Sequence, residues 1–182
     1  MPLAREIVLT AIDFETTGSV PGFPVEPWQI GVVQIRNGRV APETARERLL
    51  RIDPARPFHP QAPGRHALIR DTLAQSQTLP EAWPEFAPLL TQVPLIAHNI
   101  GTERTILTKT APLHHFGPWI DTLQWSRYAY PTLPSKALEQ VTEALGLTAR
   151  IQSLCPRAPH DASRDPRRST RSGRGAGRAA ET

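Results

Sequence analysis

The chain has 182 residues, 39% of them hydrophobic, which is enough to bury the core of one ordinary domain. Its formal net charge is +4 and its pI is about 10.0, but the basic excess is local. Residues 164–182 hold six arginines against Asp165 and Glu181, whereas residues 1–163 hold 15 basic and 15 acidic side chains. The bulk charge therefore does not indicate a nucleic-acid-binding surface on the body of the protein.

The cysteine content and the hydropathy pattern exclude two further classes of protein. Cys155 is the single cysteine, so an intrachain disulfide is excluded and a reducing compartment is indicated. The sequence shows no signal-peptide pattern and no apolar run long enough to cross a bilayer. We therefore expect a soluble, cytoplasmic protein.

Apolar, β-branched stretches predict five strands, separated by loops rich in Gly and Pro. The expected strands lie at residues 6–13, 28–35, 47–53, 93–98 and 118–121. The dipeptide Asn37–Gly38 predicts a hairpin between the second and the third. Helical patterns are expected from near Arg65 and at residues 78–90, 101–109, 122–130 and 135–146. Three strands followed by helices alternating with strands predict an α/β domain with a mixed sheet.

Helix ends carry recognisable signals. Thr78 and Glu81 have the spacing of a capping box, and Ser135 is expected to be the N-cap of the last helix. Gly146 is expected to end that helix. Asp121, ahead of the helix at 122–130, is interpreted as its N-cap rather than as a metal ligand.

The end of the sequence has a different composition. After Leu154 there is no Val, Ile, Leu, Met, Phe, Trp or Tyr. We expect residues 1–163 to form the folded domain and residues 164–182 to be an Arg/Gly-rich disordered tail.

Acidic residues follow the expected strands and raise the question of a catalytic site. Asp13 and Glu15 are two residues apart on a strand, so their side chains point to the same face, while Phe14 points into the core. Two neighbouring carboxylates repel unless a cation lies between them, and Mg²⁺ prefers such oxygen ligands. The alternative is a strand end with two solvated acids beside a turn.

Two further fragments carry candidate groups. Glu103 lies in a helix just after a strand, where strand ends meet at one edge of an open sheet. The alternative is a solvated helix acid that pairs with Lys109 or Arg104. His160 and Asp165 are five residues apart near the end of the chain, and His160 alone has the alternative of an ordinary loop histidine.

Taken together, these fragments resemble the DEDDh (DnaQ-like) 3′–5′ exonuclease superfamily. DFETTG at 13–18 is similar to its first motif, AHNIGTE at 97–103 to its second, and HDASRD at 160–165 to its third. The intervening residues 116–147 are also similar, with their Asp-Thr-Leu, Leu-Pro-Ser and Leu-Gly sequences. The resemblance covers roughly residues 6–165.

The resemblance implies a ribonuclease H-like fold and a site with two Mg²⁺ or Mn²⁺ ions. It implies that Asp13, Glu15, Glu103 and Asp165 are the metal ligands and that His160 is the general base. The implied reaction is hydrolysis of the terminal phosphodiester of single-stranded DNA or RNA at its 3′ end, releasing nucleoside 5′-monophosphates. A polymerase partner and a homodimer both remain open.

The resemblance also implies substrate contacts. Phe14 and Thr16, through backbone or side chain, are expected to meet the terminal nucleotide. His98 is expected near the scissile end, with a capping turn into the helix at 101 as the alternative.

Two departures from the family pattern are evident. The second motif usually ends in Asp, whereas Glu103 is one methylene longer. The third motif usually continues into a C-terminal helix, but Pro166 follows Asp165 directly, and a residue before Pro avoids the α region. We expect the C-terminal helix to be missing or disordered, because the reading frame shifts near residue 163 or the gene is truncated; the alternative is a genuine basic tail for nucleic acid.

The sequence thus favours an active, metal-dependent exonuclease. The alternatives are a catalytically impaired nuclease-like module that binds nucleic-acid ends, and a scaffold domain whose acids are only solvated. His114 and His115 are expected at the surface, and Asp161 is an alternative to Asp165. The four tryptophans are expected in the core, with base stacking as the alternative: Trp28, Trp83, Trp119 and Trp125.

Overall fold

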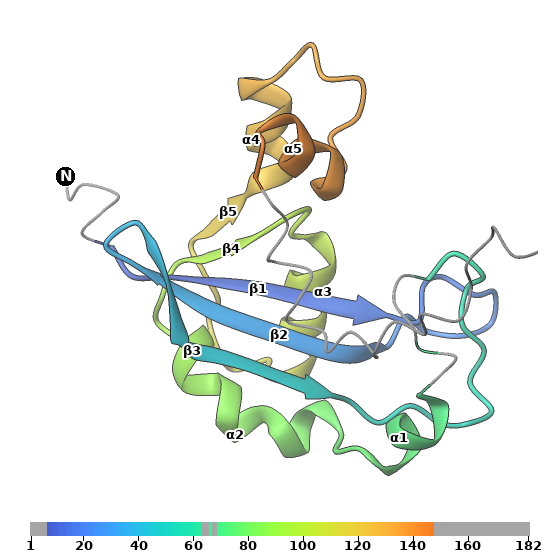
Figure 1. The fold of residues 1–182 in the computed structure, drawn as a ribbon. Helices are drawn as coiled ribbons and strands as arrows, with labels where there is room; N and C mark the ends of the chain where they lie inside the picture. The colour runs from blue at the N-terminus through green and yellow to red at the C-terminus, as the bar shows by residue number, and fades with distance from the viewer. Residues whose placement is uncertain (1–6, 63–65, 67–68, 148–182) are drawn as a thin grey trace, which may run out of the picture.

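The computed structural model describes residues 7–62, 66 and 69–147, which form a five-stranded sheet with helices packed around it (Figure 1). The strands are β1 (Leu9–Thr16), β2 (Pro27–Arg36), β3 (Arg39–Leu49), β4 (Leu95–Ala97) and β5 (Trp119–Asp121). Their order in the sheet is β3-β2-β1-β4-β5, so β1 is central. β1 pairs antiparallel with β2 and β2 with β3, whereas β4 and β5 continue the sheet in parallel. The predicted mixed α/β sheet is confirmed; the expectation for a C-terminal helix lies outside the described residues.

The hairpin between β2 and β3 forms at the predicted turn. Asn37 and Gly38 both have positive φ, 54° and 71°, and Arg36 pairs with Arg39 across the turn. β3 therefore begins at Arg39, and the strand expected at 47–53 is wrong at both ends. The polar edge strand from Arg39 lacks the apolar alternation by which strands are predicted, and the chain leaves the sheet after Leu49.

The helices are α1 (Arg70–Gln75), α2 (Leu79–Leu90), α3 (Gly101–Thr110), α4 (Thr122–Ala129) and α5 (Leu138–Ala144). The helical pattern expected from near Arg65 yields, within the described residues, only the six-residue α1. α2 begins with the predicted capping box, in which the Thr78 amide donates to Glu81 Oε2 over 2.7 Å and the Glu81 amide donates to Thr78 Oγ1 over 3.4 Å.

The last described helix begins later than expected. Ala137, not Ser135, is the N-cap of α5, and the Ser135 hydroxyl oxygen instead accepts from the Ala137 amide over 3.2 Å in the preceding turn. Gly146 ends the helix as predicted, with φ of 62°. Its amide donates to the carbonyl of Glu143 and the Leu147 amide donates to Thr142, which is the Schellman arrangement.

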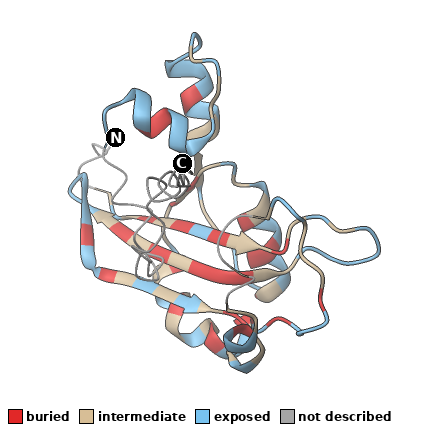
Figure 2. Ribbon diagram, turned by 45° about the vertical axis from the view of Figure 1, so that its right-hand side comes forward, coloured by how far each residue is buried: buried red, intermediate tan, exposed pale blue. Residues whose placement is uncertain are grey.

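One face of the sheet carries the main core. Buried residues alternate with more exposed ones along the central strands (Figure 2). The core joins this face to α2 and α3, and its members include Ile12, Phe14, Ile30, Val32, Phe86, Leu90, Ile106 and Leu107. Because side chains alternate along a strand, burying Ile12 and Phe14 places Asp13 and Glu15 on the opposite face.

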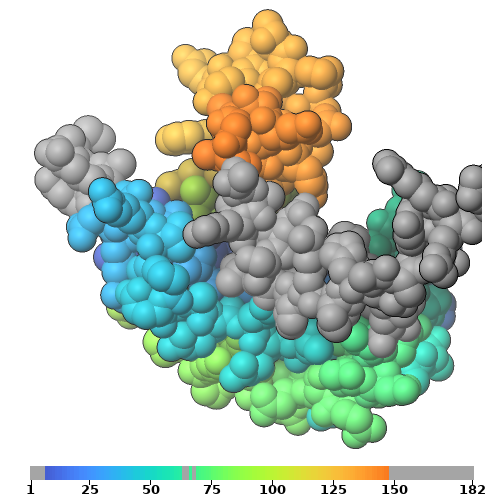
Figure 3. Space-filling view, viewed as in Figure 1, coloured from blue at the N-terminus to red at the C-terminus, as the bar shows by residue number. Residues whose placement is uncertain are grey.

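α4 and α5 form a lobe beyond the β5 edge of the sheet (Figures 1 and 3). Trp125 on α4 is 69% exposed, so its predicted place in the core is wrong, because no described residue buries its ring. Trp28 is buried, and Trp83 and Trp119 pack against the core, as predicted. His114 and His115 are exposed, as predicted. Within the described part of the chain, every helix is too short or too polar to cross a membrane.

The capping box gives a test of the fold. Thr78→Ala removes the acceptor of the Glu81 amide and should lower the free energy of unfolding by about 1 kcal/mol in a urea titration. Thr105→Ala is the matched control, because that hydroxyl only donates back to the Gly101 carbonyl within α3. The control should stay within about 0.5 kcal/mol of the wild type. Equal effects of the two substitutions would contradict the capping role of Thr78.

Candidate active site

The carboxyl ends of three parallel strands meet at one edge of the sheet. Ala11 of β1 pairs with Ile96 of β4, and Ala97 pairs with Asp121 at the end of β5. The residues that follow these strand ends are therefore neighbours, although they come from three distant parts of the sequence. Ligand sites of open α/β sheets form at such edges.

Asp13 and Glu15 project from β1 on the side opposite the core. Phe14 between them is 6% exposed, with its side chain in the core. Burial, then the charges of Asp13 and Glu139, raises the pKa of Glu15 to about 7. Asp13 is exposed, yet the protein around its carboxylate desolvates it and thereby raises its pKa. The charge of Glu139 raises this pKa further, whereas His98 lowers it. The two acids are thus a repelling pair, as the sequence predicts.

Glu103 joins this pair from the first turn of α3. It is 4% exposed, so the alternative of a solvated acid paired with Lys109 or Arg104 is wrong. Burial is the main cause that raises its pKa to about 7; the charges of Asp13 and Asp121 add to it, and bonds from its own amide and that of Phe14 oppose it. Its Oε2 is buried without a hydrogen-bond partner among the described residues.

His98 follows β4 and connects three elements. Its Nδ1 lies 3.0 Å from Thr122 Oγ1 on α4, and its Nε2 donates to the Lys136 carbonyl ahead of α5 over 2.8 Å. The capping-turn alternative is wrong, because the N-cap of α3 is Ile100 and no side chain caps it. A substrate contact through a ring nitrogen would require one of these bonds to break.

Asp121 is the N-cap of α4, as predicted. Its Oδ1 accepts from the amides of Leu123 and Gln124 over 2.9 and 3.4 Å, and from the Asn99 amide over 3.0 Å. These amides lower its pKa despite the opposing effect of burial. The same carboxylate therefore caps one helix and fixes the turn that leads to α3.

Glu139 is a member of the site that sequence reasoning missed. It is exposed in the first turn of α5, and its charge raises the pKa of both Asp13 and Glu15. Its approach depends on how the α4–α5 lobe packs against the sheet edge, and no local pattern encodes that.

Of the remaining predicted site residues, the structure describes Thr16 and Phe14. Thr16 is half-buried at the end of β1, and its hydroxyl oxygen accepts from the Gly18 amide over 3.4 Å. The ring of Phe14 is in the core, so only its backbone is placed to meet a substrate. His160, Asp165 and the alternative Asp161 lie outside the described residues.

The chemistry of the acids suits a divalent cation. Asp13, Glu15 and Glu103 are oxygen donors of the kind that Mg²⁺ and Mn²⁺ prefer, and the unpartnered Oε2 of Glu103 is a donor atom without another role. Within residues 7–62, 66 and 69–147, no group of three or more acidic, histidine or cysteine side chains has the arrangement of a metal site. The described acids therefore form a mutually repelling set that a cation would draw together.

The sequence of the chain is similar to those of known proteins. A family model described as Exonuclease (RNase_T) matches residues 10–171, a span that contains all three motifs. The chain is 29% identical over 146 residues to the PolC-type DNA polymerase III of Thermotoga maritima, and 25% identical over 146 residues to a DNA polymerase III subunit epsilon-like protein of Rhodobacter capsulatus. The matches cover 78% and 79% of this chain but only 10% and 20% of those relatives.

Two solved structures share the fold. Escherichia coli exonuclease I in complex with a dT13 oligonucleotide aligns with a TM-score of 0.61 at 16% identity, over 78% of this chain and 36% of that one. A 3′-exonuclease, from a structure of 3′-end specific recognition of histone mRNA stem-loop, aligns with a TM-score of 0.58 at 18% identity, over 77% and 55%. The expected ribonuclease H-like fold is confirmed.

The buried charge of Glu103 makes stability depend on pH. Because its pKa is raised from 4.5 to about 7, the folded metal-free protein loses stability as pH rises through that interval. Glu103→Gln should therefore raise the free energy of unfolding in EDTA by on the order of 2–3 kcal/mol at about pH 8, and hardly at all at about pH 4. Urea titrations at several pH values measure this difference.

Glu143→Gln is the matched control, because Glu143 is exposed on α5. It should leave the pH dependence of unfolding unchanged. A Glu103→Gln variant that is less stable than the wild type at about pH 8 would show that the Glu103 charge is compensated in the metal-free fold.

Proposed function

The chain belongs to the exonuclease family, as its motifs predict, and we propose that it hydrolyses the terminal phosphodiester at the 3′ end of single-stranded DNA or RNA. The products are nucleoside 5′-monophosphates. One observation carries the proposal: at one edge of the sheet the charge of Asp13 acts both on Glu15 of the same motif and on Glu103, an acid from a motif far away in the sequence. Perturbed acids at such an edge are typical of catalytic sites.

The metal ligands of the proposed enzyme are Asp13, Glu15, Glu103 and Asp165. Two Mg²⁺ or Mn²⁺ ions bound by these carboxylates would stabilise the charge that develops on the attacking and leaving oxygens. Support for such ions comes from the raised pKa values of Glu15 and Glu103: burial is their main cause and the neighbouring carboxylates add to it, and a bound cation would offset both effects by favouring the charged carboxylates. The longer side chain of Glu103 extends the reach of its carboxylate by about 1.5 Å over an Asp, roughly one carbon–carbon bond.

His160 is the proposed general base, which takes a proton from the attacking water. Its ordinary pKa of about 6.5 suits that step near neutral pH. Phe14, through its backbone, and Thr16 are proposed to contact the terminal nucleotide beside Glu15. His98 is proposed to act on the substrate indirectly, by fixing the turn between β4 and α3, since both of its ring nitrogens are engaged.

The proposed exonuclease domain spans residues 1–163, and the Arg/Gly-rich segment at 164–182 that follows it contains the proposed ligand Asp165. Two relatives are named as DNA polymerase III proteins, which makes DNA the first substrate to test and a polymerase the first partner to test. The chain spans a fifth of their length or less, so their assembly is not transferred to it.

A labelled oligonucleotide assay tests the activity. Single-stranded DNA and RNA labelled at the 5′ end should give a ladder shortened from the 3′ end with Mg²⁺ or Mn²⁺, and no ladder with EDTA. Asp13→Ala should lose the ladder while keeping a normal unfolding transition, because Asp13 is exposed on β1. Absence of cleavage by folded wild-type protein with either metal and either polymer would overturn the proposal.

The general base is tested separately. His160→Ala should lower kcat by about 10²- to 10⁴-fold, because a positioned proton acceptor contributes that much, and it should leave the affinity for Mn²⁺ nearly unchanged. Asp165→Asn should lower both, because it removes a proposed ligand. Asp161→Asn is the matched control and should match the wild type; if instead it alone lowers Mn²⁺ affinity, Asp161 is the ligand and Asp165 is not.

A further inference from the structure

The loop between β1 and β2 presents an aromatic ring to solvent near the end of β1, the strand that carries Asp13 and Glu15. Phe23 is 47% exposed, whereas the chain's other four phenylalanines, Phe14, Phe58, Phe86 and Phe116, are buried or half-buried. A turn fixes its backbone, since the Phe23 amide donates to the Val20 carbonyl over 3.1 Å. The ring is thus exposed on a structured part of the loop.

A buried guanidinium supports one face of this ring. The Cζ atom of Arg56 lies 4.7 Å from the centre of the Phe23 ring, and Arg56 is only 5% exposed. Such a cation–π contact orients an aromatic ring without burying its second face. The ring therefore has one face held by the protein and the other face and edges available to a ligand.

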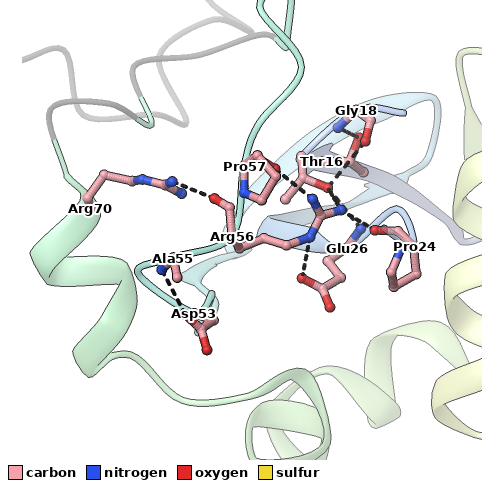
Figure 4. A network of polar contacts seen from close by, with 10 residues as sticks. Thr16, Gly18, Pro24, Glu26, Asp53, Ala55, Arg56, Pro57 and Arg70 are labelled. Atoms are coloured by element: carbon pink, nitrogen blue, oxygen red, sulfur yellow. Dashed lines mark hydrogen bonds and ion pairs between the residues drawn. The ribbon is translucent and has the colours of Figure 1, made fainter. Parts of the chain in front are cut away.

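The protein itself engages Arg56 through all three of its guanidinium nitrogens (Figure 4). Its Nε lies 3.2 Å from Glu26 Oε2, its Nη1 donates to the Pro57 carbonyl over 2.6 Å, and its Nη2 donates to Thr17 Oγ1 over 3.2 Å. Nη2 also donates to the Pro24 carbonyl. Because its charge is paired with Glu26, four of its five N–H groups donate within the protein and its side chain is buried, this Arg is poorly placed to bind a phosphate. What the loop offers a ligand is an apolar, flat surface.

The same contacts fix the ring relative to the acids. Thr17 lies two residues after Glu15, and its amide donates to the Glu26 carbonyl over 2.9 Å. The Thr17 carbonyl accepts from the His59 amide over 2.8 Å. Gly18 has φ of +69°, and a Cβ there would lie 2.6 Å from the Cβ of His59, so the two loops are in close contact. The end of β1 and the loop of Phe23 are therefore joined by backbone hydrogen bonds and by the Arg56 side chain.

We propose that the outer face of the Phe23 ring is a stacking platform for a base of the single-stranded nucleic-acid substrate. The inference rests on the proposed function and adds a binding residue to it. A neutral, flat base suits this surface because the cation beneath it, Arg56, is already paired with Glu26. Stacking on an aromatic side chain also accommodates any base sequence. Arg56 is then a positioning residue, which holds the platform at the end of β1.

Substitutions of Phe23 in the full chain test the platform. The probe is a fluorescein-labelled oligothymidylate, whose binding is measured by anisotropy in Ca²⁺ and whose cleavage is measured in Mg²⁺. Phe23→Ala should weaken binding and raise KM by roughly 5- to 150-fold, the usual value of one base–aromatic stack, with little change in kcat. Phe23→Trp should keep wild-type affinity.

Phe23→Leu separates stacking from structural support. Leucine still covers the Arg56 guanidinium but has no aromatic face, so it should behave as Phe23→Ala does if the ring stacks on a base. Wild-type binding by Phe23→Leu would mean that the ring only shields Arg56, and would overturn the proposal. Val25→Ala is the matched control, because Val25 is 44% exposed in the same loop and should contribute little.

An oligothymidylate whose 3′-terminal nucleotides lack bases identifies the contact. If Phe23 stacks on one of those bases, the wild type should bind the base-free probe more weakly than the normal probe, by the same factor by which Phe23→Ala weakens binding of the normal probe. Phe23→Ala itself should bind the two probes with similar affinity. If the substitution and the removal of the bases each weaken binding by their own factor, and the two factors multiply in the combination, the assignment is overturned. Wild-type protein that binds but does not cut would contradict the proposed function alone, whereas cleavage that is indifferent to Phe23 would contradict the platform alone.

Discussion

The alternation of side chains along β1 is the constraint on which the rest of this structure depends. Ile12 and Phe14 pack into the core between the sheet and α2 and α3, so Asp13 and Glu15 must face the other way. Since β1 is the central strand, a slip of one residue would put two carboxylates into the core and two apolar side chains outside. Core packing therefore sets the direction of the acids, and the stability of the core must offset their repulsion.

Two sets of hydrogen bonds fix the ends of the strands that carry the site, one at β1 and one at β4. At the end of β1, Arg56 bonds Thr17 and the loop that returns to β2. At the end of β4, His98 bonds Thr122 and Lys136, which fixes the α4–α5 lobe against the sheet edge. Both act through backbone atoms or hydroxyl groups within a few residues of a carboxylate. Positioning of this kind matters because a displacement of about 1 Å can cost on the order of 10²-fold in rate.

The sequence predicted most local features, although not the N-cap of α5, and it missed what depends on packing. The capping box of α2 and the N-cap Asp121 each involve residues three or fewer positions apart, and both are present. The sequence also predicts that Phe14 points into the core and that Asp13 and Glu15 point to the other face of the strand. The partners of His98, by contrast, are 24 and 38 residues away, and the burial of Glu103 depends on α3 packing beside β1. Trp125 was expected in the core because α4 has an apolar pattern, but its lobe does not cover the ring.

The charge at the sheet edge links cation and substrate. Asp13, Glu15, Glu103 and Glu139 interact there, and the pKa of Glu15 and of Glu103 is raised to about 7. A phosphodiester approaching the metal-free edge would meet a group of carboxylates, whereas bound divalent cations would offer it positive charge. Each ligand must then strengthen the binding of the other by the same factor, because coupling between two binding equilibria is reciprocal. In such a site the repulsion among the acids has a use: it keeps nucleic acid from occupying the edge before the ions are in place.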